Sequence, residues 1–387
     1  MADTILILGN GFDIAMGRKT KYTDFIEFEQ RLFAEPESDL QAFLDSRSID
    51  IDKYKDNLYL KFINENRDKI GENWSNLEIV ISQLADAIIF FKDNNEILFN
   101  VTSSNQIWLL EDKLLKEKNY VSKVYIAKVF IELYRYKGWR ILEREVALEK
   151  LNNEFINQLD LLIELLEIYL SYLDYLDFEV GEIKAKPTAL DAVSVLSNSS
   201  VLNFNYTNTS SHLFETFEEK THFIHGRINL DRAFNRINTM VFGIEDKEND
   251  VNSDLIPYQK YYQRVVKETG NKFEEFFIKR NYTVKNTFPL GRAVPTRIPV
   301  SKNIVIFGHS VDPLDKEIFQ KCFELVKKGE YPYRFIFTYY DDAAKRSIIK
   351  NLAIILGKEK LVELTGKRNV VFVKSDDKNG MEELLLP

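Results

Sequence analysis

The chain of 387 residues is 45% apolar and 13% aromatic, which is enough for a large hydrophobic core in one large domain or two ordinary ones. This composition excludes an intrinsically disordered protein. The formal net charge of −8 gives the molecule as a whole no attraction for nucleic acid.

The first predicted element is a strand over residues 4–8, because Thr4-Ile-Leu-Ile-Leu8 is a continuous apolar run, typical of a strand buried on both faces. This run is too short for a signal peptide, and Asp3 precedes it. No other apolar run approaches the roughly 18 to 20 residues of a membrane span. We therefore expect a cytoplasmic protein without a membrane partner.

Helical periodicity begins near Tyr22 and continues to about Leu176. Apolar residues recur at spacings of three and four in 79–91 and in 155–172. Proline, which ends helices, is absent from residues 72–178. The middle of the chain is therefore predicted to be a helical block.

Short strands alternate with helices in the rest of the chain. The predicted strands lie at the end of 193–206 and at 222–225, 240–243, 303–308, 333–338 and 370–373, and the main helices at 313–327 and 342–353. This alternation predicts an α/β fold with a doubly wound, mostly parallel, Rossmann-like sheet. The expected domains are a Rossmann-like nucleotide-binding core of residues 1–28 and 190–387, and an α-helical insertion of residues 29–189. The single cysteine, Cys322, is expected to be a small core residue within a helix. One thiol excludes a four-thiolate zinc site.

The segment Arg264–Lys302 is locally basic, with nine Lys or Arg against three Asp or Glu. Its Pro and Gly residues predict a loop. Either this loop is solvated and balances acidic helices, or it faces a phosphate or a nucleic acid.

Gly9-Asn10-Gly11 lies where the first strand passes into a helix. Glycines there allow the backbone to approach a phosphate at the N-terminus of the helix, although a purely structural turn has the same composition. The next glycine is Gly17, and no acidic residue ends a second strand about 20 residues later. This spacing argues against a redox dinucleotide site.

Three further polar clusters follow predicted strands. Asn203-Phe-Asn-Tyr-Thr-Asn208 offers amides suited to a ribose or a carboxamide, or is an Asn-rich turn. His225, followed by Gly226, is a candidate general base or a structural histidine. Gly308-His309-Ser310, with Asp312 and Asp315, suits either a phosphate or helix capping.

The carboxyl ends of parallel strands meet at one edge of a sheet, so we expect these four clusters to share one crevice. No two His or Cys residues have the spacing of metal ligands on a helix, so no metal is expected. A Ser/His/Asp triad is not supported, because the chain has no Gly-x-Ser-x-Gly elbow.

These residues, in this order, resemble the AbiH family of bacteriophage abortive-infection proteins. The matching stretches are Ile7–Asp13, Tyr22–Phe25, Trp74–Glu78, Asn203–Asn208, Ile224–Gly226, Phe242–Glu245, Tyr261–Arg264 and Gly308–Ser310 with Asp315. Where the family usually has Gly-Leu-Pro, this chain has Gly17-Arg18-Lys19.

The same succession is more distantly similar to the sirtuin-like NAD-binding fold. That resemblance implies Asn205 and His225 as catalytic residues, the first beside the nicotinamide ribose and the second as the base. It implies a site for NAD, as substrate or ligand, made of Gly9, Asn10, Gly11, Phe12, Asp13, Tyr206, Thr207, Asn208, Gly226, Gly308, His309, Ser310 and Asp315. Thr207 stands where the motif normally has Asp. One cysteine instead of four argues against a zinc-containing protein deacylase.

Three functional hypotheses follow. The first is an antiphage effector that hydrolyses NAD to nicotinamide and ADP-ribose, acting as a homo-oligomer and responding to a phage-derived trigger. The second is a module that binds NAD or ADP-ribose without turnover. The third, which the acidic composition disfavours, is a toxin that acts on nucleic acid through the basic segment.

Overall fold

The computed structural model describes residues 2–34, 37–71, 74–99, 107–134, 141–231, 238–244, 252–287 and 294–387. The chain forms two compact units, of which unit 1 comprises Met1–Thr20, Leu170–Ile228 and Thr269–Pro387, and unit 2 comprises Lys21–Tyr169 and Asn229–Glu268. The predicted division had other bounds, since residues 170–189 lie in unit 1 and residues 21–28 and 229–268 in unit 2.

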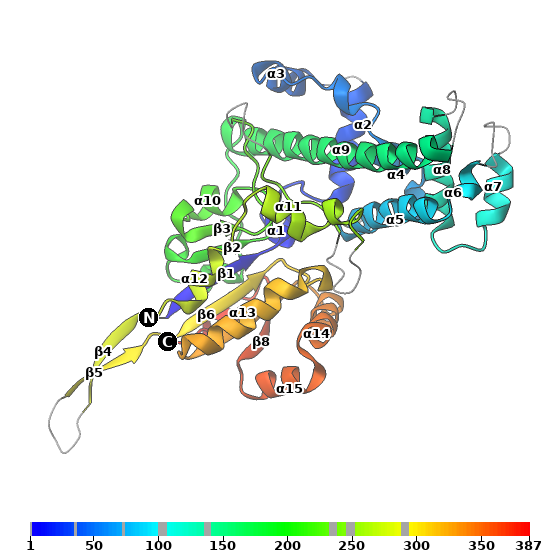
Figure 1. Ribbon diagram of the computed structural model, residues 1–387. Helices are drawn as coiled ribbons and strands as arrows, with labels where there is room; N and C mark the ends of the chain where they lie inside the picture. Colours follow the sequence, from blue (N-terminus) through cyan, green and yellow to red (C-terminus); the bar gives the residue numbers. More distant parts are fainter. Residues whose placement is uncertain are drawn as a thin grey trace. The chain divides into compact units, whose positions relative to one another are not determined.

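Unit 1 contains a six-stranded sheet in which every pairing is parallel (Figure 1). In spatial order the strands are β3 (Thr221–Phe223), β2 (Ser200–Asn203), β1 (Asp3–Leu8), β6 (Lys302–Phe307), β7 (Tyr333–Tyr339) and β8 (Val370–Lys374). The predicted α/β fold with a parallel sheet is therefore confirmed.

Both faces of this sheet are buried, as the continuous apolar run of β1 predicts. Ile5 and Ile7 join one core cluster, and Leu6 and Leu8 join another, because successive side chains of a strand point to opposite faces. The first face is covered by α12 (Phe273–Ile278), α13 (Lys316–Gly329), α14 (Asp342–Leu356) and α15 (Lys358–Gly366), and the second by α1 (Asn10–Ala15), the 3₁₀ helix η5 (Ala189–Ala192) and α16 (Lys378–Leu384). Cys322 of α13 is fully buried, as expected, and burial raises the pKa of its thiol well above the ordinary range.

The register places the carboxyl ends of four strands at the same level. Leu8 of β1 pairs with Asn203 of β2 on one side and with Phe307 of β6 on the other. Asn203 in turn pairs with Phe223 of β3. The residues that follow these strands therefore lie side by side along one edge of the sheet.

Unit 2 is helical. Its helices are α2 (Tyr22–Ala34), α3 (Ser38–Ser46), α4 (Leu58–Glu65), α5 (Trp74–Asp93), α6 (Asn95–Phe99), α7 (Ile107–Leu114), α8 (Tyr120–Tyr134), α11 (Lys260–Val266) and the part of α9 (Ile141–Asp174) that ends at Tyr169. The predicted helical block is thus confirmed for the described residues.

Helix α5 corrects one expectation about apolar runs. Of the helices that the structure describes, it alone is long and apolar enough to cross a membrane by length and composition. Eight of its residues are buried in the protein, among them Ile81, Leu84 and Ile88. A core helix passes the same test.

Two other sequence predictions are wrong. Residues 240–243 are buried but form no strand, because the side chain of Gln263 accepts a hydrogen bond from Phe242 N and donates one to Phe242 O, in place of a ladder. The segment 264–302 is not simply a loop, since it includes α12 and an antiparallel hairpin of β4 (Tyr282–Thr287) and β5 (Val294–Pro299). Pro295 and Pro299 are compatible with β5 because, in the described structure, β5 pairs with β4 on one side only and is therefore an edge strand. Residues 288–293 of the predicted loop, and Glu245 of the family stretch, lie outside the described residues.

Candidate functional site

Two turns at the carboxyl edge of the sheet are packed backbone against backbone. The N–H of Gly9 donates to Phe307 O at 3.0 Å, and the N–H of Gly11 donates to Gly308 O at 2.8 Å. A Cβ atom on Gly9 would lie 2.7 Å from Gly308 O, and one on Gly11 would lie 2.8 Å from the same atom. Gly308 has φ +69°, and a Cβ there would collide with the backbone of Phe12. These glycines are required by the fold, and the Gly11 N–H is already used within it.

The loop after β2 carries Asn205 and is held by several hydrogen bonds. Phe204 N donates to Leu8 O at 2.9 Å, and Asn205 N donates to Asn203 Oδ1 at 3.0 Å. The carboxamide nitrogen of Asn205 donates to Gly9 O at 3.0 Å. Its carboxamide oxygen accepts no hydrogen bond from the described part of the chain. This buried side chain is therefore fixed at one end and has a hydrogen-bond acceptor at the other.

His225 lies in the turn after β3 and is paired with a carboxylate. Its Nε2 lies 3.2 Å from Oδ1 of Asp315, the residue before α13. The second oxygen of Asp315 lies 3.5 Å from Nε2 of His309. Val311 N donates to His309 Nδ1 at 2.8 Å, so the neutral His309 ring carries its proton on Nε2, toward Asp315. Asp315 thus bridges two imidazoles.

The ring of Phe204 lies against both of these histidines. Its centroid is 5.6 Å from that of His225 and 4.3 Å from that of His309, both in edge-on geometry. The side chains of His225 and His309 are 10% and 6% exposed. Phe204 therefore links the Asn205 loop to the histidine pair and gives the Asp315 cluster an apolar wall.

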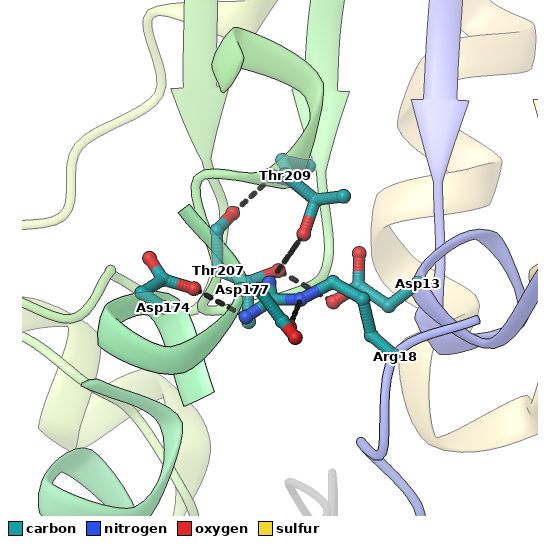
Figure 2. Close-up of polar contacts among 7 residues, drawn as sticks. Asp13, Arg18, Asp174, Asp177, Thr207 and Thr209 are labelled. Carbon is teal, nitrogen blue, oxygen red and sulfur yellow. Dashed lines mark hydrogen bonds and ion pairs between the residues drawn. The ribbon is translucent and has the colours of Figure 1, made fainter. Parts of the chain in front are cut away.

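A second polar network surrounds Arg18, and Figure 2 shows its six labelled residues. The guanidinium donates from Nε to Asp177 at 2.7 Å and from Nη2 to Asp174 at 2.5 Å. Its Nη1 donates to the hydroxyl of Thr209 at 2.6 Å. The Arg18 side chain is completely buried, whereas those of Asp174 and Asp177 are 15% and 24% exposed. The arginine thus ties the loop after α1 to the end of α9 and to the π-helical turn Tyr175–Val180.

From Thr209 the network continues to a buried carboxylate. The Thr209 hydroxyl donates to that of Thr207 at 3.1 Å, and Thr207 donates to Asp13 Oδ2 at 2.5 Å. A guanidinium can only donate hydrogen bonds, so the donor and the acceptor are fixed in each hydrogen bond of the series from Arg18 through Thr209 and Thr207 to Asp13. The other oxygen of Asp13, Oδ1, is buried and has no hydrogen-bond partner among the described residues.

Burial governs the protonation of this network. It raises the pKa of Asp13 to about 6, although Arg18 and the two threonine hydroxyls favour the ionised form. It likewise raises the pKa of Asp174 to about 6, against the effect of Arg18. For Arg18, burial acts to lower the pKa, but Asp174, Asp13 and Asp177 together hold it above its ordinary value.

The remaining predicted site residues have varied surroundings. Asn10 Nδ2 donates to Thr20 O at 2.9 Å, and Phe12 is buried against Phe307. Tyr206 and Asn208 are half-buried and accept backbone hydrogen bonds, from Ile228 and from Ser211 and His212 respectively. Gly226 has φ +73°, and Ser310 is exposed. The side chain that caps the following 3₁₀ turn, Pro313–Asp315, belongs to Asp312 and not to Ser310.

Sequence reasoning missed the Arg18 network. In the sequence, Arg18 is identified only as a departure from the family pattern. Its partners lie 156 to 191 residues away in the chain, so no local pattern identifies them. Among the described residues, no three His, Cys, Asp or Glu side chains are arranged as ligands of a metal ion.

A family model described as "Bacteriophage abortive infection AbiH" matches residues 5–338. No curated protein and no solved structure matches the chain. The family match covers both units and all four strand-end clusters, and it confirms the resemblance that the sequence stretches carry. The chain therefore belongs to the AbiH family of bacteriophage abortive-infection proteins.

Proposed function

We propose that this AbiH protein is an antiphage effector whose unit 1 binds NAD in a sirtuin-like manner and hydrolyses it to nicotinamide and ADP-ribose. The observation that carries the proposal is that Asn205, His225 and Asp315 follow three different strands at the same edge of one parallel sheet. The protein would act in the cytoplasm as a homo-oligomer, after a phage-derived trigger.

The order of the strands supports a dinucleotide at this edge. Counted within the sheet, the order is 3-2-1-4-5-6, the order of Rossmann-like dinucleotide-binding sheets. From β1 the chain proceeds outward through β2 to β3 and then returns to β6 on the other side of β1. Ligands of such sheets bind where the order reverses, which here is between the ends of β1 and β6, at Gly9 and Gly308.

The chemistry requires little of the protein. Water attacks C1′ of the nicotinamide ribose, and the bonding electrons of the C1′–N bond pass to the pyridinium nitrogen, so that nicotinamide leaves neutral and needs no proton. The proton of the attacking water passes to His225, which Asp315 holds in place 3.2 Å away. The acceptor oxygen of Asn205 orients the water or a ribose hydroxyl.

The test is a time course of NAD, nicotinamide and ADP-ribose with purified protein, alone and with lysate of phage-infected cells. Wild type is compared with Asn205→Ala and His225→Ala. His222→Gln is the matched control, because His222 packs on Phe273 of α12 (ring centroids 5.5 Å apart), a residue that is not part of the proposed site. We expect the first two variants to lose about 100-fold or more of the rate. Full activity in His225→Ala would contradict the proposal.

A binding module without turnover is the alternative. Under that alternative, NAD would raise the melting temperature of wild type while no nicotinamide formed, with or without lysate.

A further inference from the structure

The hairpin of β4 and β5 is a two-stranded ribbon within unit 1, drawn in yellow in Figure 1. It belongs to no larger sheet in the described structure. Residues 282–286 of its first strand and 295–297 of its second are all exposed. Two of these side chains are large and apolar, Tyr282 at 52% and Val284 at 61% exposure. None of its described side chains belongs to the two core clusters of unit 1, so the choice of these residues needs another explanation.

The charge of this part of the chain is of one sign. Asp and Glu are absent from residues 276–311, whereas the chain's average would give this stretch about five or six. Lys279, Lys285 and Arg297 are exposed, and no carboxylate of the described residues forms an ion pair with them. Arg280, by contrast, is paired with Glu330 at 3.0 Å. The ribbon is therefore a local cationic surface on an acidic protein.

The register of the hairpin assigns these side chains to its two faces. Val284 pairs with Arg297 and Tyr282 pairs with Pro299, so Tyr282, Val284 and Arg297 share one face. Lys285 pairs with Thr296 and lies on the other face. One face thus combines an exposed aromatic ring with a guanidinium, and each face has a cation.

We propose that the β4–β5 ribbon docks nucleic acid, with Lys285 and Arg297 on phosphates and the Tyr282 ring on a base. Exposed cations without an ion-pair partner among the described residues are complementary to a phosphate backbone, and an aromatic side chain on the same face as an arginine suits base stacking. The attraction is local, because charges farther away than a Debye length of about 8 Å are screened at physiological salt. The protein's net charge of −8 therefore does not prevent it.

A second copy of this chain, added strand to strand, is the less favoured occupant. Pro295 and Pro299 lie in β5, and proline lacks the N–H that a new neighbouring strand would need. Lys285 lies in β4, and in a pairing of β4 with β4 of a second copy it would face another lysine, whose like charge repels it. The ribbon's chemistry thus favours contact through side chains.

The test is fluorescence anisotropy of the full chain with labelled single-stranded RNA, single-stranded DNA and duplex DNA of about 20 nucleotides per strand. The variant Lys285→Glu/Arg297→Glu is compared with Arg346→Glu/Lys350→Glu, the same change of charge on the exposed surface of α14. Wild type should bind at about 50 mM salt and weaken as salt rises. Reversal on the ribbon should weaken binding by about tenfold or more and lower the log–log salt slope by about two, while reversal on α14 changes affinity by less than about twofold.

A third variant separates stacking from charge. Tyr282→Ala should weaken binding of single strands more than binding of the duplex, because only unpaired bases offer their faces to a side chain. The proposal is overturned if wild type binds none of the three probes at low salt, or if the two charge reversals weaken binding equally. It is also overturned if the ribbon reversal leaves affinity unchanged but dissociates an oligomer in light scattering, which would assign the ribbon to a second copy. None of these outcomes depends on NAD turnover.

Discussion

His225 and Asp315 are 90 residues apart in the chain, yet His225 Nε2 lies 3.2 Å from Asp315 Oδ1. One residue follows β3 and the other precedes α13, so only the parallel sheet brings them together. The same carboxylate reaches His309 at 3.5 Å. Asp315, which the sirtuin-like resemblance suggested as a nucleotide ligand, is thus placed to position two imidazoles.

Replacing Asp315 tests this positioning role. Asp315→Asn keeps the size of the side chain but removes the charge that orients His225, so we expect kcat for NAD cleavage to fall by about 10- to 100-fold with KM nearly unchanged. Asp312→Asn is the matched control, since its side-chain oxygen still accepts from Leu314 N. A rise in KM at constant kcat would instead make Asp315 a direct substrate ligand.

Gly308→Ala tests the contact between the two turns. An added Cβ is strained at φ +69° and also collides with the backbone of Phe12. We expect a loss of more than about 3 kcal/mol in the free energy of unfolding, measured with urea. Gly270→Ala is the control, because Gly270 has φ +70° with nothing within 4 Å, so only the backbone strain of about 1 to 2 kcal/mol remains. Equal losses in the two variants would show that the close approach is not important.

Arg18→Met tests the buried arginine. The substitution leaves Asp174 and Asp177 without their cation and the Thr209 hydroxyl without its donor, so we expect a loss of about 3 to 5 kcal/mol in stability. The same change at Arg346, on the exposed surface of α14, should cost less than about 0.5 kcal/mol. If the two variants unfold at the same urea concentration, the Arg18 network contributes nothing to stability.

The buried carboxyl of Asp13 predicts a pH dependence with a definite sign. Its pKa is raised to about 6 in the folded protein, so the folded state binds more protons than the unfolded state between about pH 4 and pH 6. Stability conferred by the protonated form is therefore lost as pH rises through this window, by about 3 kcal/mol for this group.

Asp13→Asn removes this titration and retains an oxygen that accepts from Thr207. The difference in unfolding free energy between wild type and Asp13→Asn should therefore shift in favour of the variant as pH rises from about 4 to about 7, and become constant above that. The pKa of Asp174 stays raised in the variant, so the unfolding free energy of the variant still falls somewhat as pH rises. A difference that is independent of pH would contradict the burial of an ionisable Asp13.

The sheet edge was predictable because its signals are local. Apolar runs ending in Gly9, Asn203, His225 or Gly308 mark strands that pass into polar turns, and parallel strands have their carboxyl ends on one side. The Arg18 network was not predictable, because its bonds join residues more than 150 positions apart. The apolar run at 240–243 was wrongly predicted to be a strand, because the side chain of Gln263 makes the backbone hydrogen bonds to Phe242 that a neighbouring strand would otherwise make.

The β4–β5 hairpin was missed for a different reason. Its prolines and glycine are typical of loops, whereas Thr283, Val284 and Ile298 favour strands, and the two signals compete within a short segment. An isolated ribbon also lacks the alternation of buried and exposed residues that identifies a strand of a larger sheet, since the described residues of β4 up to Asn286 are exposed on both faces.

If the proposed function is right, phage infection makes this protein consume NAD at the carboxyl edge of its sheet. The most direct test measures cellular NAD and nicotinamide during infection, together with phage yield, in cells expressing wild type or His225→Ala at equal levels. We expect wild type to limit phage yield while NAD falls and nicotinamide rises, and we expect none of these three changes with His225→Ala. Protection by wild type at constant NAD would contradict it.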